Sequence, residues 1–249
     1  MNFIPKNLFS QFTKLANTYF LIMMLLELIP AISDSGGFPV LLFPLGFVVM
    51  VSMIKDAYED YQRHKSDMKE NRSKVLVGNV ETRSFEERTW ADIQVGNIIK
   101  IEQDQLFPAD LILVNSSEPK GICYIETKNL DGETNLKHKK AQKETVELSA
   151  NDSTCIKEFG RGWKVECEMP NEFLHRFDGV LRTVNTNVLI SPENFLLRGS
   201  NLRNTEFIYG IVVFTGHETK VMKNSMQSKM KYSKVERMTN TYIFVIMVV

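Results

Sequence analysis

The chain has 249 residues, of which 43% are hydrophobic and 24% are charged. Its 30 basic and 30 acidic side chains cancel to a formal net charge of zero, which argues against a nucleic-acid-binding domain because such domains carry a strong basic excess. The length allows one large domain or two modest ones.

The few cysteines and histidines are not spaced as metal ligands. No two cysteines form a Cys-x-x-Cys pair, and no histidine cluster accompanies them. The cysteines are Cys123, Cys155 and Cys167, and the histidines are His64, His138, His175 and His217. We therefore expect reduced cytosolic thiols rather than a zinc site or a disulfide framework, and no metal held by this chain.

Two apolar runs occupy the first quarter of the chain. Residues 16–32 carry a single formal charge, Glu27, and residues 38–54 carry none. Each run has about 17 residues, the lower limit for a helix that spans a bilayer, and residues 33–37 form the short turn between them. We predict a transmembrane helical hairpin over residues 16–54. The alternatives are a buried hairpin in a soluble core and, for the first run, a cleaved signal sequence.

Basic residues lie on both outer flanks of this hairpin and are absent from its turn. They are Lys6 and Lys14 before it, and Lys55, Arg63, Lys65, Lys69, Arg72 and Lys74 after it. Because basic flanks favour the cytosolic side, we expect both ends of the hairpin there. Residues 1–15 are predicted to form a short cytosolic helix, and residues 55–73, with their mixed charges, a helical stalk.

A β-rich domain is predicted over residues 74–237. Short strand-like runs separated by turn signals suggest a compact sandwich or barrel. The runs cover residues 74–80, 98–102, 110–114, 122–127, 195–202 and 206–215. The more polar section of about residues 138–191 interrupts them, and we interpret it as insertions on the surface.

The last part of the chain is apolar again. Residues 242–249 contain no polar side chain after Tyr242, and eight residues are too few to cross a bilayer. We expect residues 238–249 to begin a third membrane helix that is cut short, with a buried C-terminal strand as the alternative.

The tetrapeptide Asp131-Gly132-Glu133-Thr134 is the most informative motif of the chain. Glycine permits a tight turn, so that Glu133 and Thr134 present a carboxylate and a hydroxyl from a loop tip. Taken alone, an Asp-Gly pair is more typical of an ordinary polar turn between two strands.

The longer run of residues 126–137, Glu-Thr-Lys-Asn-Leu-Asp-Gly-Glu-Thr-Asn-Leu-Lys, resembles the actuator-domain signature of type IV P-type ATPases, the phospholipid flippases. Further matches cover residues 3–9, 108–110, 197–199 and 203–205, so the resemblance extends over essentially the whole chain. It implies a mixed fold, in which the transmembrane helical hairpin precedes an actuator domain built as a distorted double-stranded β-helix or jelly roll.

The resemblance also implies a chemical role for the loop. In that family the loop glutamate, here Glu133, orients and activates the water that hydrolyses an aspartyl phosphate on another domain. Thr134 is expected to help hold the water or the phosphate, while Asp131 and Gly132 set the turn. The full-length enzyme would use ATP and Mg²⁺, neither of them bound within this chain, to move phospholipid toward the cytosolic leaflet.

Partners are implied in the same way. They are the phospholipid, the downstream phosphorylation and nucleotide-binding domains of the same enzyme, and an accessory β-subunit of the kind common among flippases. The chain itself has no Asp-Lys-Thr-Gly phosphorylation motif and no Walker-type loop, so we expect no ATPase activity from it alone. Another P-type cation transporter and a non-catalytic membrane-tethered fragment are the alternative functions.

Three further residues are candidates for substrate binding. A proline late in the first apolar run, Pro30, removes a helical hydrogen bond and can leave polar backbone at membrane depth. With Ser33 it resembles the Pro-x-x-Ser part of the flippase headgroup route, and Glu27 lies nearby in the sequence. The alternative for Glu27 is a hydrated carboxylate near the membrane interface.

Two other segments resemble structural turns of actuator domains. The first runs from Trp90 to Asn97 and has asparagine where the family usually has aspartate, and the second is Pro108-Ala109-Asp110. Because asparagine and aspartate both hydrogen-bond their own backbone in turns, we interpret both segments as structural rather than catalytic.

Overall fold

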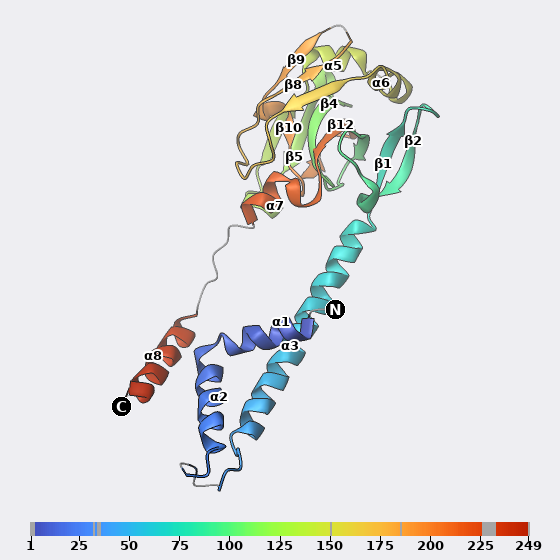
Figure 1. The fold of residues 1–249 in the computed structure, drawn as a ribbon. Coiled ribbons are helices and arrows are strands. Elements are labelled where there is room, and N and C mark those ends of the chain that lie inside the picture. The colour runs from blue at the N-terminus through green and yellow to red at the C-terminus, as the bar shows by residue number, and fades with distance from the viewer. Residues whose placement is uncertain are drawn as a thin grey trace. The chain divides into compact units, whose positions relative to one another are not determined.

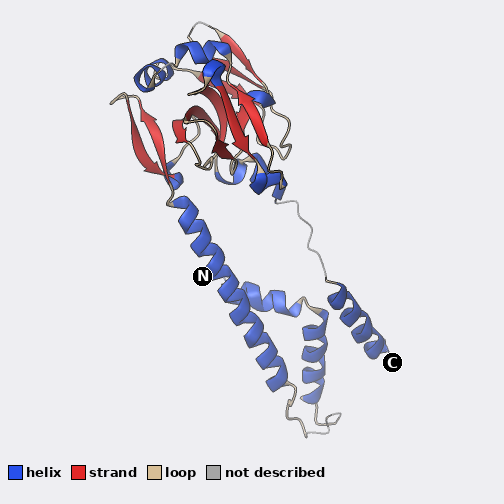
Figure 2. Ribbon diagram, turned by 180° about the vertical axis from the view of Figure 1, so that it is seen from behind, coloured by secondary structure: helices blue, strands red, loops and turns tan. Residues whose placement is uncertain are grey.

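The computed structural model describes residues 3–31, 33, 36–149, 151–184, 186–225 and 233–248. The chain divides into two units, residues 1–68 with 229–249 and residues 69–228, and Figure 1 labels many of their elements. Helices make up the described part of the first unit, whereas every described strand belongs to the second (Figure 2). The prediction of helices followed by a β-rich domain is therefore confirmed.

The first unit contains α1 (Phe3–Phe12), α2 (Leu15–Glu27), α8 (Lys234–Val248) and most of α3 (Leu42–Asn71). Hydrogen bonds fasten α1 to α3, because Asp56 Oδ2 accepts from Asn7 Nδ2 and from Gln11 Nε2, both at 2.9 Å. The buried Asn17 amide donates to the Gln11 carbonyl at 2.9 Å and closes the corner between α1 and α2.

The helices of the predicted hairpin differ in length from the apolar runs. The first, α2, ends at Glu27 although the run continues to residue 32, because Pro30 has no N–H to donate and disfavours helix in the residue before it. The second, α3, begins at Leu42 rather than at residue 38 and continues without a break into the predicted stalk of residues 55–73, as far as Asn71. No described helix is both long enough and apolar enough to cross a membrane.

The segment predicted to begin a third membrane helix, residues 238–249, lies in α8 except for residue 249, which is outside the described residues. The alternative of a buried C-terminal strand is wrong, because residues 234–248 are helical. This helix starts at Lys234, before the apolar run begins.

Antiparallel sheets form the second unit. Its strands are β1 (Lys74–Asn79), β2 (Ser84–Thr89), β3 (Ile98–Glu102), β4 (Asp110–Ser116), β5 (Ile122–Glu126), β6 (Leu136–Lys140), β7 (Lys164–Cys167), β8 (Gly179–Arg182), β9 (Asn187–Ile190), β10 (Phe195–Leu196), β11 (Asn201–Arg203) and β12 (Phe207–Phe214). They form a central sheet in the order β10-β4-β12-β3-β1-β2 and two small sheets, β11-β5-β6 and β7-β8-β9. The helices of this unit are α4 (Lys128–Asp131), α5 (Lys143–Leu148), α6 (Asp152–Phe159) and α7 (Lys220–Ser225).

The strands β4 and β12 of the central sheet are buried on both faces, whereas the edge strand β2 has no buried residue. Successive side chains of a strand point to opposite faces, and in β4 Leu111 and Leu113 belong to one hydrophobic cluster while Ile112 and Val114 belong to another. All seven residues of β4 are buried. Its four consecutive apolar residues, 111–114, are typical of a strand covered on both sides.

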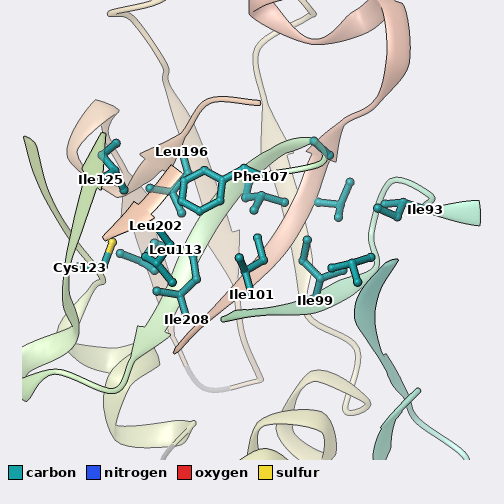
Figure 3. Packing of buried hydrophobic residues seen from close by; sticks show 14 of the residues in the cluster. Ile93, Ile99, Ile101, Phe107, Leu113, Cys123, Ile125, Leu196, Leu202 and Ile208 are labelled. Atoms are coloured by element: carbon teal, nitrogen blue, oxygen red, sulfur yellow. The ribbon is translucent and has the colours of Figure 1, made fainter. Parts of the chain in front are cut away.

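Each small sheet supplies side chains to one of these two clusters. Cys123 and Ile125 of β5 pack with Leu202 of β11 against the central sheet in the first cluster (Figure 3). Val188 and Ile190 of β9 belong to the second cluster.

Our interpretation of residues 138–191 as insertions on the surface is wrong for β8 and β9, which have buried residues. In β9, Val188 and Ile190 are buried and alternate with exposed residues, and Leu181 of β8 is fully buried. Alternate apolar residues in a polar stretch are sufficient to cover a sheet face, because only every second side chain points inward. The segment therefore contributes a layer of the core.

Candidate functional site

The loop that carries Glu133 connects the antiparallel neighbours β5 and β6, whose last pair is Glu126 with Leu136. The connection starts with a short helix, α4. Gly132 follows this helix and ends it by adopting the left-handed conformation, with φ 76°. The Gly132 N–H donates to the Lys128 carbonyl at 3.0 Å. Glycine suits this position because a left-handed residue with a side chain is strained.

The Asp131 carboxylate organises the backbone of the loop. Its Oδ1 accepts from the Glu133 N–H at 2.9 Å, and its Oδ2 accepts from Thr127 Oγ1 at 2.8 Å and from Lys137 Nζ at 2.6 Å. The Lys137 hydrogen bond, followed by the Glu133 N–H, lowers the pKa of Asp131 to about 2. Asp131 is therefore ionised throughout the physiological pH range.

Glu133 and Thr134 are both exposed. The Glu133 side chain is 58% exposed, and its Oε2 lies 2.9 Å from Lys137 Nζ. The structure thus gathers Asp131, Gly132 and Glu133 around one lysine, with the carboxylate of Glu133 facing solvent. This arrangement allows the carboxylate to act on a group outside the unit.

Lys137 and Thr127 are site residues to which the sequence analysis gave no role. Lys137 Nζ contacts both loop carboxylates. These contacts raise the pKa of Lys137, and the hydrogen bond to Asp131 has a larger effect than the one to Glu133. The four-residue spacing of Glu133 and Lys137 was an available signal, although both lie outside a regular helix. Thr127 and Asp131 are also four residues apart, but this spacing is informative only once the short helix α4 between them is known.

Leu130 holds the loop by packing its side chain into the second unit. It lines a cavity with residues of the second unit, and a Cβ atom added to Gly199 would meet Leu130 Cδ2 at 3.5 Å. The apolar Leu130 therefore packs inward while the polar residues after it face outward. This division explains why one short segment can be both fixed and accessible.

In the two predicted turns, the side chains of Asn97 and Asp110 accept hydrogen bonds from backbone N–H groups. Asn97 Oδ1 accepts from the Gln94 N–H at 2.9 Å, as expected for a side chain that closes its own turn. Asp110 is fully buried, and its two oxygens accept from the backbone N–H groups of Arg198 at 2.8 Å and Lys220 at 2.7 Å. Burial raises the pKa of Asp110 to about 6 despite these hydrogen bonds.

The three candidate substrate-binding residues belong to the first unit, at and after the end of α2. Glu27 Oε2 accepts from the Leu41 N–H at 3.0 Å, immediately before α3 begins. Ser33 Oγ accepts from the Gly37 N–H at 3.4 Å, and Pro30 Cγ lies 3.4 Å from the position of a Gly37 Cβ. The contact of Glu27 is that of a carboxylate at a helix N-terminus.

Among the residues that the structure describes, no group of three acidic, histidine or cysteine side chains is arranged to hold a metal ion. Cys123 and Cys155 are buried, and burial raises the pKa of each thiol to about 12. These thiols are therefore neutral and unreactive.

Comparison with known proteins assigns the chain to a family. A family model described as "Phospholipid-translocating ATPase N-terminal" matches residues 1–41. The chain is 43% identical over 245 residues to human "Phospholipid-transporting ATPase ID" and 46% identical over 245 residues to "Probable phospholipid-transporting ATPase 11" of Arabidopsis thaliana. These alignments cover 98% of the chain and 20% of each relative, so the chain spans about a fifth of the length of these curated relatives. The chain belongs to the phospholipid-transporting ATPases, the type IV P-type ATPases, and corresponds to their N-terminal portion.

Proposed function

We propose that this chain supplies the dephosphorylating loop of an ATP-driven phospholipid flippase, with Glu133 as the group that activates water. The observation that best supports the proposal is an exposed carboxylate on a loop whose backbone is held by Asp131 and Leu130. A catalytic carboxylate that acts on another domain needs both accessibility and a fixed base.

The reaction would take place on an aspartyl phosphate of a downstream domain. A water molecule hydrogen-bonded to Glu133 attacks the phosphorus atom, the bond between phosphorus and the aspartate oxygen breaks, and a water proton passes to Glu133. Thr134, next to it on the exposed tip, is suited to hold the water or a phosphate oxygen. Asp131 and Gly132 keep the tip in position and do not exchange protons.

The membrane part of the proposal concerns the first unit. We propose that α2 and the apolar first half of α3 lie in a membrane with both outer ends in the cytosol, since large apolar side chains are exposed along them, among them Phe20, Phe47 and Ile54. A cysteine introduced at Gly36 should then react with an impermeant maleimide only from the non-cytosolic side. Labelling from the cytosol alone would contradict this topology.

Residues 74–237 would form the actuator domain, as a distorted jelly roll. The full-length enzyme would use Mg²⁺ and ATP, and its downstream phosphorylation and nucleotide-binding domains and an accessory β-subunit would be its partners. The names of the relatives favour phospholipid over a cation as its substrate.

Glu27, Pro30 and Ser33 are our candidates for the headgroup route. Transport of labelled phospholipids by the Pro30→Ala and Ser33→Ala variants tests them.

The decisive experiment replaces Glu133 in a full-length enzyme that contains this segment. Glu133→Gln keeps the size and polarity of the side chain but removes the base, so dephosphorylation should slow by roughly a hundredfold to ten-thousandfold. The phosphoenzyme should accumulate when ATP is supplied, and lipid transport should stop. The matched control is Glu147→Gln, an exposed glutamate of α5, which should dephosphorylate at the parent rate. A Glu133→Gln enzyme with the parent rate after an ATP chase would show that Glu133 is only a turn residue.

A further inference from the structure

A cavity of about 140 Å³ lies under the Glu133 loop, within the second unit. Its walls come from segments far apart in the sequence: Ile125 of β5, Leu130 of α4, Leu174 and Phe177, and Phe195 and Leu197. Glu133 and Thr134 do not line it. The cavity therefore does not include the exposed loop tip, although Asp131 and Lys137, which contact Glu133, are among its lining residues.

The size and walls of the cavity suit one aromatic ring. Phe177 stacks on Phe195 with ring centroids 4.1 Å apart, and both rings are almost fully buried, so the wall is rigid. An apolar cavity of about 150 Å³ in another protein holds one benzene molecule. A ring here would pack against Leu130 on one side and the stacked phenylalanines on the other.

The lysine and aspartate side chains that line the cavity, Asp131, Lys137 and Lys139, already have partners. Lys137 pairs with Asp131 at 2.6 Å, and Lys139 Nζ donates to the Pro192 carbonyl at 2.7 Å. Burial lowers the pKa of Lys139, which further weakens its attraction for an anion. A charged ligand would gain little in this cavity and would lose its hydration.

One polar atom of the cavity has no partner. Ser200 is fully buried and lines the cavity, and its Oγ has no hydrogen-bond partner among the described residues. A buried hydroxyl left in this way destabilises the folded state, because it has lost its hydrogen bonds to water without gaining others. A ligand atom that exchanges a hydrogen bond with Ser200 Oγ would recover part of that free energy.

We propose that this cavity binds a neutral single-ring molecule with one hydroxyl group, the ring against Leu130 and Phe177 and the hydroxyl on Ser200 Oγ. Because Leu130 belongs to α4, an occupied cavity holds in place the helix that carries the loop. An effect of this ligand on dephosphorylation rests on the proposed function of Glu133, whereas the binding of the ligand does not.

The test uses phenol as the probe and the 249-residue chain in detergent. The amide NMR shifts of Leu130, Phe177 and Ser200 should change saturably with phenol concentration, with a dissociation constant on the order of 1 mM. Because these three residues line the cavity, shift changes confined to its lining distinguish binding there from partition of phenol into detergent. Ser200→Ala should weaken phenol binding about fivefold to tenfold while leaving benzene binding unchanged. Non-saturable shifts, or equal losses for phenol and benzene, would overturn the proposal.

A second pair of variants tests the location. Leu174→Trp fills the cavity and should abolish phenol binding, whereas Leu189→Trp, at a residue of β9 that is 74% exposed, should bind as the parent does. Unchanged binding by Leu174→Trp would also overturn the proposal, and if that variant fails to fold, Ser200→Ala decides. The Glu133→Gln kinetics are independent of these outcomes, so failure of either proposal is recognised separately.

Discussion

Lys137 contacts two carboxylates of the loop at once, Asp131 at 2.6 Å and Glu133 at 2.9 Å. Such exposed pairs contribute little to folding stability. Their effect here is local, because the lysine hydrogen bond is the main cause of the low pKa of Asp131. The ionised Asp131 in turn accepts the Glu133 N–H, which links the charge of one residue to the backbone position of another.

Replacing Lys137 should therefore change Asp131. In the Lys137→Met variant we expect the pKa of Asp131 to rise from about 2 toward its ordinary value of 3.8, because the largest cause of the shift is removed. Carboxyl NMR titration of the chain measures this. Lys137→Arg keeps the charge and serves as the control, with a pKa that stays low. An Asp131 pKa unchanged in the methionine variant would mean that the ion pair does not persist in solution.

Asp110 shows the opposite behaviour, since its folded-state pKa of about 6 lies above the ordinary value of 3.8. The protonated carboxyl therefore favours folding, and this contribution is complete below about pH 4 and is lost as the pH rises through about 6. At about 1.4 kcal/mol for each pKa unit, the loss amounts to about 3 kcal/mol.

Comparison with Asp110→Asn isolates this effect. The asparagine variant cannot titrate at this position, so its free energy of unfolding should increase relative to the parent by about 2–3 kcal/mol between pH 4 and pH 6. Urea unfolding of both proteins at several pH values measures the difference. A difference that does not depend on pH would show that Asp110 titrates normally in the folded protein.

At the scale of elements, the short helix α4 and its glycine cap decide how the loop is presented. Gly132 has φ 76°, and a Cβ atom there would meet nothing within 4 Å. Gly132→Ala should therefore cost about 1 kcal/mol through backbone strain alone, without a clash.

Gly162 offers a matched control, because it has φ 93° and also has open space around its Cβ position. Gly162→Ala should reduce the free energy of unfolding by a similar amount in chemical denaturation. Only Gly132→Ala should in addition slow dephosphorylation in a full-length enzyme, because it changes the loop that carries Glu133. Equal kinetic effects of the two variants would indicate that general instability, rather than loop geometry, is responsible.

The small sheet β7-β8-β9 illustrates how tertiary packing overrides a polar sequence. Its segment also supplies Glu168 and Asn171, whose side chains accept from Lys220 Nζ at 2.8 Å and 2.6 Å. Lys220 is fully buried, so the ammonium group requires these partners. This layer consequently both covers the central sheet and neutralises a buried charge at the start of α7.

At the scale of the whole molecule, residues 69–228 contain both hydrophobic clusters and all described strands. A segment with its own core is expected to fold by itself. We predict that a protein of residues 69–228 gives a dispersed NMR spectrum and unfolds cooperatively in urea. Molten behaviour, with poor dispersion and a broad transition, would mean that the helices of the first unit are needed for folding.

The strands with consecutive apolar residues were predictable, and these are β1, β3, β4, β5 and β12. The predicted runs did not include β2, β6, β7, β8 or β9. The predicted runs at residues 98–102 and 110–114 correspond closely to β3 and β4. The lengths of the helices in the first unit were less predictable. The apolar run continues past Glu27, the last residue of α2, and hydrophobicity does not show how far before Pro30 the helix ends.

Residues 126–137 were sufficient to predict the family and the tight turn at Gly132, because both depend on neighbours in the chain. Tertiary packing alone accounts for the buried face of β9, for the hydrogen bond from the Lys220 N–H to Asp110, and for the cavity that Leu130 and Phe177 share. These contacts join residues separated by dozens of positions. The free energy that selects them comes from burying apolar surface and pairing buried polar groups across layers, which local sequence patterns do not contain.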